Sequence, residues 1–158
     1  MALGSIAATQ SSEKTLSFYN THTGESLKAV YWCKGEYCRD SLAEFDFILR
    51  DFRADEVKPI APPLLDLVYE LSHMLNSNAP IHIISAYRSP ATNAMLAARS
   101  NGVAAHSLHL LGKAIDLRVP GRGLPDVRRA ALALQGGGVG YYPRSDFVHV
   151  DIGRVRHW

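Results

Sequence analysis

The sequence predicts one α+β domain with a central antiparallel sheet and flanking helices. Apolar residues repeat at helical spacing in the first half of the chain, whereas short strand-like stretches dominate the second half. This distribution is typical of α+β domains with an antiparallel sheet. The length of 158 residues, 47% of them hydrophobic, suits a single domain with its own core.

The first predicted element is a β-hairpin. Residues 15–19 and 26–32 favour strands, and the turn-rich residues 20–24 connect them. Residues 1–14 form a polar, small-residue segment without periodicity, which we expect to be a disordered tail. The domain is therefore expected to span residues 15–158.

Two amphipathic helices should follow the hairpin. Asp40 or Ser41 can cap the first, and Pro62 and Pro63 start the second. The apolar positions that repeat at helical spacing are Leu42, Phe45, Leu49 and Phe52 in the first helix, and Leu64, Leu67, Val68, Leu71 and Leu75 in the second.

The second half of the chain alternates between short strands and helices. The predicted elements are a buried strand at 81–85, a helix opened by Ser89 and Pro90 and running to about 99, a strand at 113–119, a helix at 125–134, and two final strands after the glycine loop 136–138. Strand 113–119 and the last strand, 147–152, both alternate apolar and polar residues.

The charge pattern excludes a nucleic-acid-binding function. The 17 basic and 15 acidic residues give a net charge of +2, and the basic residues form no stripe. No apolar run is long enough for a transmembrane segment, and the first residues lack the charged region of a secretory signal. We expect a monomer.

The two cysteines leave two interpretations open. Cys33 and Cys38 would suit a small disulfide loop in an oxidising compartment, or they could be two buried free thiols. Without a second cysteine pair, a cysteine-rich structural zinc site is not indicated.

Two histidines and an aspartate form the strongest functional signal. Strand alternation directs Asp116 and His149 toward one cleft if their strands are neighbours, and Gly112 favours a loop position for His109. Two imidazoles and one carboxylate, without a fourth strong ligand, form the ligand set of a catalytic zinc site that keeps one position open for water.

These residues also carry a family resemblance. Ser107-x-His109-x-x-Gly112-x-Ala114-x-Asp116, followed later by His149-x-Asp151, resembles the zinc peptidases that include D-Ala-D-Ala peptidases, lysostaphin-type enzymes and the hedgehog domain. Within this group the chain resembles the MepK-like murein endopeptidases, through residues 85–90, 92–93, 139–143 and 153–158. The resemblance implies the fold of that group, Zn2+ as cofactor, and export to the periplasm.

A zinc peptidase also needs a general base, and two carboxylates are candidates. Asp151 lies on the same strand face as His149, and it is favoured either as the base or as a residue that orients the histidine. Asp146 lies three residues before His149, where D-Ala-D-Ala peptidases carry a longer glutamate; it could equally be a turn residue.

The resemblance further implies that Arg88 binds substrate and stabilises the developing oxyanion, for which a planar guanidinium is well suited. Other residues expected at the cleft are Ser85 and Tyr87 on the wall near Arg88, Ser107 beside the ligands, His106 near the cleft, and one of Tyr141 and Tyr142 as a substrate wall. A ligating His106 would instead close the metal site and make it structural.

The function these expectations favour is a zinc-dependent murein endopeptidase that hydrolyses an amide in peptidoglycan cross-links, near diaminopimelate. The alternatives are a D-Ala-D-Ala carboxypeptidase or dipeptidase, and a non-catalytic, zinc-containing module that binds the cell wall.

Overall fold

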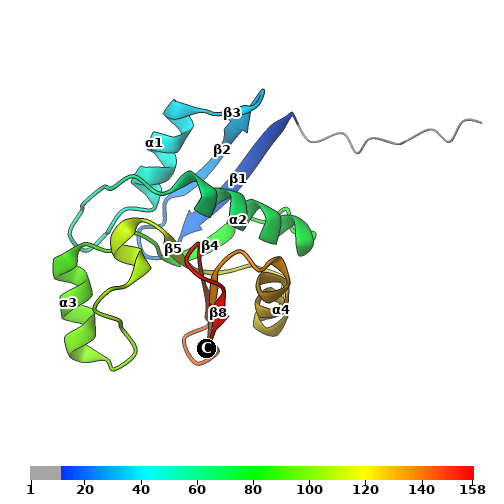
Figure 1. Cartoon of the computed structure of the whole chain (residues 1–158). Coiled ribbons are helices and arrows are strands. Elements are labelled where there is room, and N and C mark those ends of the chain that lie inside the picture. Colours follow the sequence, from blue (N-terminus) through cyan, green and yellow to red (C-terminus); the bar gives the residue numbers. More distant parts are fainter. Residues whose placement is uncertain (1–11) are drawn as a thin grey trace, which may run out of the picture.

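A mixed eight-stranded sheet forms the centre of the protein, in the strand order β3-β2-β1-β4-β5-β7-β6-β8. The computed structural model describes residues 12–158. The elements in chain order are β1 (Glu13–Asn20), β2 (Ser26–Cys33), β3 (Glu36–Tyr37), α1 (Arg39–Ile48), α2 (Pro62–Met74), β4 (Ile81–Ser85), α3 (Pro90–Arg99), the 3₁₀ helix η1 (Leu108–Leu111), β5 (Ala114–Arg118), α4 (Leu124–Leu134), β6 (Gly138–Tyr142), β7 (Phe147–Asp151) and β8 (Arg156–His157). The α+β class is confirmed (Figure 1).

The N-terminal boundary differs slightly from the expectation. β1 begins at Glu13, so residues 13 and 14, which we assigned to the tail, belong to the first strand. The rest of the predicted disordered tail, residues 1–11, lies outside the described residues.

The prediction of an antiparallel sheet is wrong at two places. β4 pairs with β1 in parallel, and β8 pairs with β6 in parallel. The first parallel pair arises because α1 and α2 form a crossover connection between the hairpin and β4. Such a connection allows β4 to run beside β1 in the same direction. Strand alternation carries no information about direction, so the sequence did not reveal it. The two-residue edge strands β3 and β8 were too short to predict.

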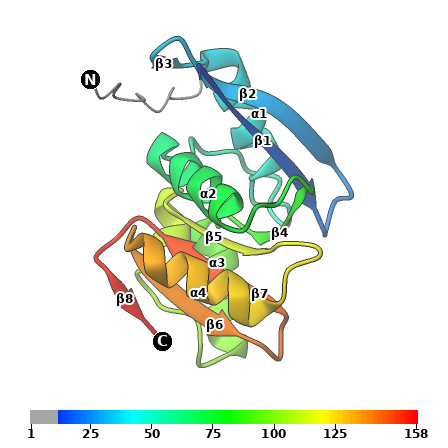
Figure 2. The ribbon, with the colours of Figure 1, turned by 90° about the vertical axis from the view of Figure 1, so that its right-hand side faces the viewer.

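Helices cover both faces of the sheet. α2 and α4 lie next to each other on one face, where their apolar residues pack on the strands (Figure 2). α3 lies on the other side of the central strands (Figure 1). The core between the sheet and these helices contains fully buried residues from both, such as Phe18, Ile115, Leu64 and Val127. This leaves the α3 face of β5 and β7 available for a site.

The helix ends follow the predicted signals in part. Ser89 caps α3, because its hydroxyl accepts a hydrogen bond from the backbone N of Thr92 at 3.2 Å. α1 instead begins at Arg39 after Cys38, without a side-chain cap, and ends at Ile48. The predicted helical position Phe52 therefore lies in the loop after α1, although the apolar periodicity reaches it.

The cysteines are free thiols in this structure. Cys33 and Cys38 are half-buried, and their Sγ atoms lie 3.2 Å apart. None of the helices in residues 12–158 has the length and the apolar character needed to cross a membrane.

Candidate metal centre

The sheet and a short helix bring the three predicted ligands together. β5 and β7 pair antiparallel with Asp116 directly opposite His149. His109 comes from η1 rather than from a loop, and Gly112, at φ 65°, ends that helix in the left-handed conformation. The potential ligand atoms of the three residues all lie within 4.8 Å of one another, and all three residues are buried.

Hydrogen bonds on the outer side fix the orientation of both imidazoles. The Nδ1 atom of His109 lies 2.7 Å from the carbonyl oxygen of Ala86, and Nε2 of His149 lies 2.8 Å from Oδ2 of Asp151. If these nitrogens carry the protons, the free lone pairs are on Nε2 of His109 and Nδ1 of His149. Those two atoms lie 3.3 Å and 2.9 Å from Oδ1 of Asp116. Three lone-pair donors thus face one point, which is an arrangement that fits a metal ion.

The electrostatics keep Asp116 ionised. Burial by itself would raise the pKa of Asp116. When the imidazoles are protonated on the side of Asp116, the charge of His109 and hydrogen bonds from both histidines hold that pKa well below its usual range. Burial would lower the pKa of His149, and the carboxylates of Asp116 and Asp151 raise it instead. A cation at this point would therefore meet a carboxylate that is already deprotonated.

The Asp151 carboxylate is completely buried, and both of its oxygens accept hydrogen bonds. Its Oδ1 accepts hydrogen bonds from the backbone N of Gly138 and of Gly153, both at 2.9 Å. Arg156 binds both carboxylate oxygens, at 3.0 Å and 2.9 Å. Since Asp151 contacts the outer nitrogen of His149, it lies across the ring from the three ligand atoms. This position fits the orienting role and not the role of general base.

Arg88 lies beside the metal centre in a nearly enclosed position. NH1 donates to Oδ1 of Asn93 at 3.1 Å, and NH2 lies 3.7 Å from Oδ2 of Asp116. The backbone N of Arg88 donates to the carbonyl oxygen of His109, so η1 and the turn before α3 hold each other in place. Nε has no hydrogen-bond partner although it is buried. Since Arg88 also lines the cleft, its guanidinium is placed to donate to a substrate.

A cleft of about 480 Å³ opens onto these groups. Among the predicted residues it is lined by the three ligands, Arg88, His106, Ser107 and Asp151. Sequence reasoning assigned no role there to Phe147, Arg156 and Trp158, which also line it. The ring centroid of Trp158 lies 5.1 Å from that of His149, and its Nε1 donates to the hydroxyl of Tyr142 at 2.7 Å. The aromatic residues near the chain end were the signal that could have identified this wall.

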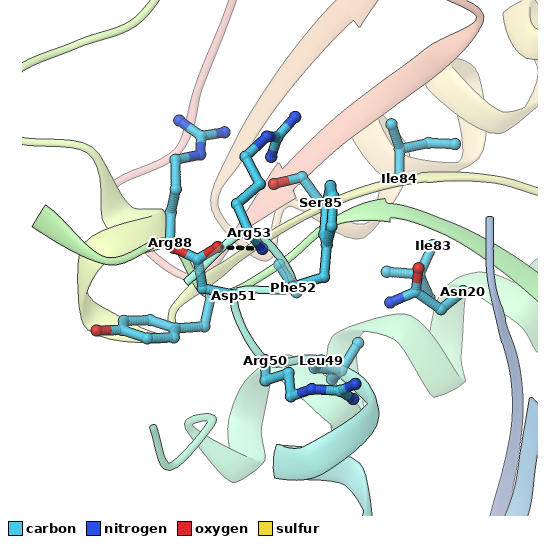
Figure 3. A pocket seen from close by; sticks show the side chains of 12 residues that line it. Asn20, Leu49, Arg50, Asp51, Phe52, Arg53, Ile83, Ile84, Ser85 and Arg88 are labelled. Atoms are coloured by element: carbon cyan, nitrogen blue, oxygen red, sulfur yellow. Dashed lines mark hydrogen bonds between the residues drawn. The ribbon is translucent and has the colours of Figure 1, made fainter. Parts of the chain in front are cut away.

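Four other candidates lie away from the cleft lining. Ser85 and Tyr87 line a small pocket that reaches Arg88 from the side of the loop after α1 (Figure 3), and the Tyr87 hydroxyl donates to Glu56 at 2.8 Å. Tyr141 packs under the guanidinium of Arg128, so Tyr142 is the tyrosine at the cleft. The exposed carboxylate of Asp146 pairs with Arg118 at 2.9 Å.

The chain is similar to known proteins over nearly its whole length. Residues 8–158 match the family model described as peptidoglycan L,D-endopeptidase MepK, Peptidase_M15_2. The chain is 46% identical over 145 residues to the peptidoglycan L,D-endopeptidase MepK of Escherichia coli strain K12, covering 92% of this chain and 80% of that protein. It is 42% identical over 146 residues to the probable peptidoglycan L,D-endopeptidase MepK of Haemophilus influenzae, covering 92% and 78%.

Proposed function

Because this chain belongs to the peptidoglycan L,D-endopeptidase MepK family, we propose that it is a zinc-dependent endopeptidase that hydrolyses amide bonds in the peptide cross-links of peptidoglycan. The observation that carries the proposal is the convergence of His109, Asp116 and His149 at the floor of an open cleft. An open groove suits a cross-linked polymer better than it suits a small dipeptide, which favours an endopeptidase over a carboxypeptidase.

Zinc is the metal that the donor set favours. Two neutral imidazoles and one carboxylate match the protein ligands of catalytic zinc sites in which the fourth position stays open. When bound, such an ion polarises the scissile carbonyl and makes water acidic enough to attack it near neutral pH. His106 lines the cleft without joining the three ligands, which is consistent with an open position.

We assign the role of proton acceptor to Asp146. The residues on either side of it, Ser145 and Phe147, line the cleft. Its partner Arg118 lies two residues after Asp116 on β5, and therefore on the same face of the sheet. The Asp146 side chain is 65% exposed, and opening an exposed ion pair costs only about 1 kcal/mol or less. Asp146 can then turn to the cleft and exchange a proton with the attacking water and the leaving amine.

The other residues hold the ligands and the substrate. Asp151 keeps the proton on Nε2 of His149, and Ala86 does the same for Nδ1 of His109. Arg88 donates to the carbonyl oxygen on which negative charge develops, or to a nearby substrate carboxylate. The aromatic side chains of Tyr142, Phe147 and Trp158 form a wall for the peptide.

The relatives' name indicates a bond between an L and a D centre. Cross-links between two diaminopimelate residues contain such a bond, and we propose these as the substrate rather than D-Ala-diaminopimelate links. The compartment would then be the one that contains peptidoglycan, the periplasm.

Digestion of isolated peptidoglycan tests the function. Zinc-loaded protein should convert cross-linked muropeptide dimers into monomers, as measured by chromatography and mass spectrometry, and a chelator should abolish this. Asp116→Asn should be inactive, whereas Asp126→Asn, on the exposed surface of α4, should retain the activity. If the protein released D-Ala from free pentapeptides and left the cross-linked dimers intact, it would instead be a carboxypeptidase. Unchanged muropeptide profiles would exclude catalysis.

A further inference from the structure

We propose that Arg53 and Arg88 together form a carboxylate-binding subsite next to the metal centre, and that this subsite takes a free carboxylate of the stem peptide. The inference rests on the proposed function and deepens it, because it names the substrate group recognised. Arg53 would be the residue that determines specificity. Sequence reasoning did not select Arg53, which lies in the loop after α1.

Arg88 connects the cleft to the position of Arg53. Arg88 lines both the cleft and the small pocket, and Arg53 and Ser85 line that small pocket with it. Figure 3 shows the side chains of Arg53 and Arg88 extending in the same direction from the loop and from the turn before α3.

In the part of the chain that the structure describes, Arg53 has no anionic partner, and Arg88 shares the one that it has. Among residues 12–158, no carboxylate lies within 4.0 Å of the Arg53 guanidinium, whereas the nearby Arg50 pairs with Glu25 and Asp55. Among residues 12–158, the carboxylate within 4.0 Å of the Arg88 guanidinium is that of Asp116, at 3.7 Å, and Asp116 also faces both histidines. The Arg88 side chain is 10% exposed and its Nε has no partner. The pair therefore carries two positive charges against one shared carboxylate, and the excess of positive charge favours the binding of an anion.

Arg53 is held in place before any ligand binds. Its guanidinium lies over the ring of Phe52 at 4.4 Å, and that ring stacks on His22 at a centroid distance of 4.3 Å. Its backbone N donates to Oδ1 of Asp51 at 3.0 Å, the bond drawn in Figure 3. A preorganised guanidinium loses little conformational entropy when a ligand binds.

The geometry of the ligand follows from the guanidinium. Arginine donates two parallel hydrogen bonds to a planar carboxylate, and an amide of the same size cannot accept both. Stem peptides carry free carboxylates on diaminopimelate and D-glutamate, and amidation removes their charge with little change of shape. Acid and amide forms of one substrate therefore test the subsite directly.

The experiment compares zinc-loaded wild-type protein with Arg53→Gln and Arg53→Lys. The matched control is Arg129→Gln, which removes an equal charge from the exposed surface of α4. The substrates are synthetic cross-linked peptide dimers with free carboxylates, and the same dimers amidated at diaminopimelate or at D-glutamate. kcat and KM are measured separately, and the affinity for the uncross-linked product peptide is measured by calorimetry.

We expect the wild type and Arg129→Gln to show a KM about tenfold lower for the acid than for one of its amides, as expected for one charge-assisted hydrogen-bonded contact. Arg53→Gln should abolish this preference with kcat nearly unchanged, and Arg53→Lys should retain part of it. The proposed subsite would be overturned if Arg53→Gln kept the full preference for the acid substrate. It would also be overturned if this variant raised KM equally for the acid and the amide.

The calorimetry separates this inference from the proposed function. If the wild type cleaves no dimer, the proposed function fails, and the binding data still decide the subsite. Weaker binding of the acid peptide, but not of the amide, by Arg53→Gln would support it, and equal binding by both proteins would contradict it.

Discussion

The Nε2 atom of His149 lies 2.8 Å from Oδ2 of Asp151, on the side of the imidazole opposite the other two ligands. With the proton on Nε2, shared with Asp151, the lone pair of Nδ1, 2.9 Å from Oδ1 of Asp116, is available to a metal ion. We therefore propose that Asp151, a candidate base in the sequence, positions a ligand.

Asp151→Asn should weaken metal binding. An asparagine at this position loses the charge that holds His149 and Arg156, and changes of this kind typically reduce metal affinity or activity about 10- to 100-fold. Competition with a chromophoric chelator measures the affinity, with Asp126→Asn as the control. Wild-type affinity combined with lost hydrolysis would show instead that Asp151 acts as the base.

Asn93→Ala should raise KM more than it lowers kcat. Asn93 is buried, accepts from NH1 of Arg88 at 3.1 Å, and donates to the carbonyl oxygen of Ala104 in the loop that lines the cleft. Its removal leaves these groups unpaired at a cost of about 1–3 kcal/mol in stability. Steady-state kinetics and urea unfolding measure both effects. The exposed Asn78→Ala is the control, and an unchanged KM would mean that Arg88 does not bind substrate.

Gly138→Ala should disturb the support of His149. A Cβ at Gly138 would lie 2.5 Å from Oδ2 of Asp151 and would also overlap Arg156, so their ion pair must shift. We expect a loss of stability of about 1–3 kcal/mol and weaker metal binding. Gly123→Ala, whose Cβ would meet ordinary contacts at 3.6 Å and 3.8 Å, is the control. Thermal unfolding with and without zinc would show the effect, and equal behaviour of the two variants would contradict it.

Asp51→Asn should remove stability that depends on pH. Burial would raise the pKa of Asp51, but hydrogen bonds from Thr92, Ser89 and Ala54 lower it. A carboxyl group whose pKa is lowered on folding stabilises the protein above the unfolded pKa of about 3.9, and this stabilisation disappears as the pH falls through the folded pKa.

Urea unfolding at several pH values tests this expectation. At pH 7 the wild type should be more stable than Asp51→Asn by about 1–3 kcal/mol, and the difference should shrink below about pH 4. Asp126→Asn, in an exposed pair, should show almost no difference at any pH. A difference for Asp51→Asn that grows in acid would have the wrong sign for this account.

The convergence of Asp116 and His149 was easier to predict from the sequence than the directions of the strands. Alternation in β5 and β7 placed Asp116 and His149 on one face, and antiparallel pairing brought them opposite each other. Alternation cannot reveal the direction of a strand, so the parallel pairs of β1 with β4 and of β6 with β8 were missed.

Residues that approach the site through long-range contacts could not be predicted either. Trp158 reaches His149 because β8 pairs with β6 and turns the chain end toward the cleft. Arg53 reaches the surroundings of Arg88 because Asp51, in the loop after α1, accepts a hydrogen bond from Ser89 at the start of α3. Neither contact has a local sequence pattern, since each joins segments that are distant along the chain.

The central claim is that His109, Asp116 and His149 bind one metal ion. Anomalous diffraction at the zinc absorption edge, from crystals of the zinc-loaded protein, tests it most directly. We predict one zinc peak per chain at about 2.0–2.2 Å from Nε2 of His109, Nδ1 of His149 and a carboxylate oxygen of Asp116. A zinc peak at Cys33 and Cys38, or no peak between the three ligands at full zinc loading, would contradict the claim.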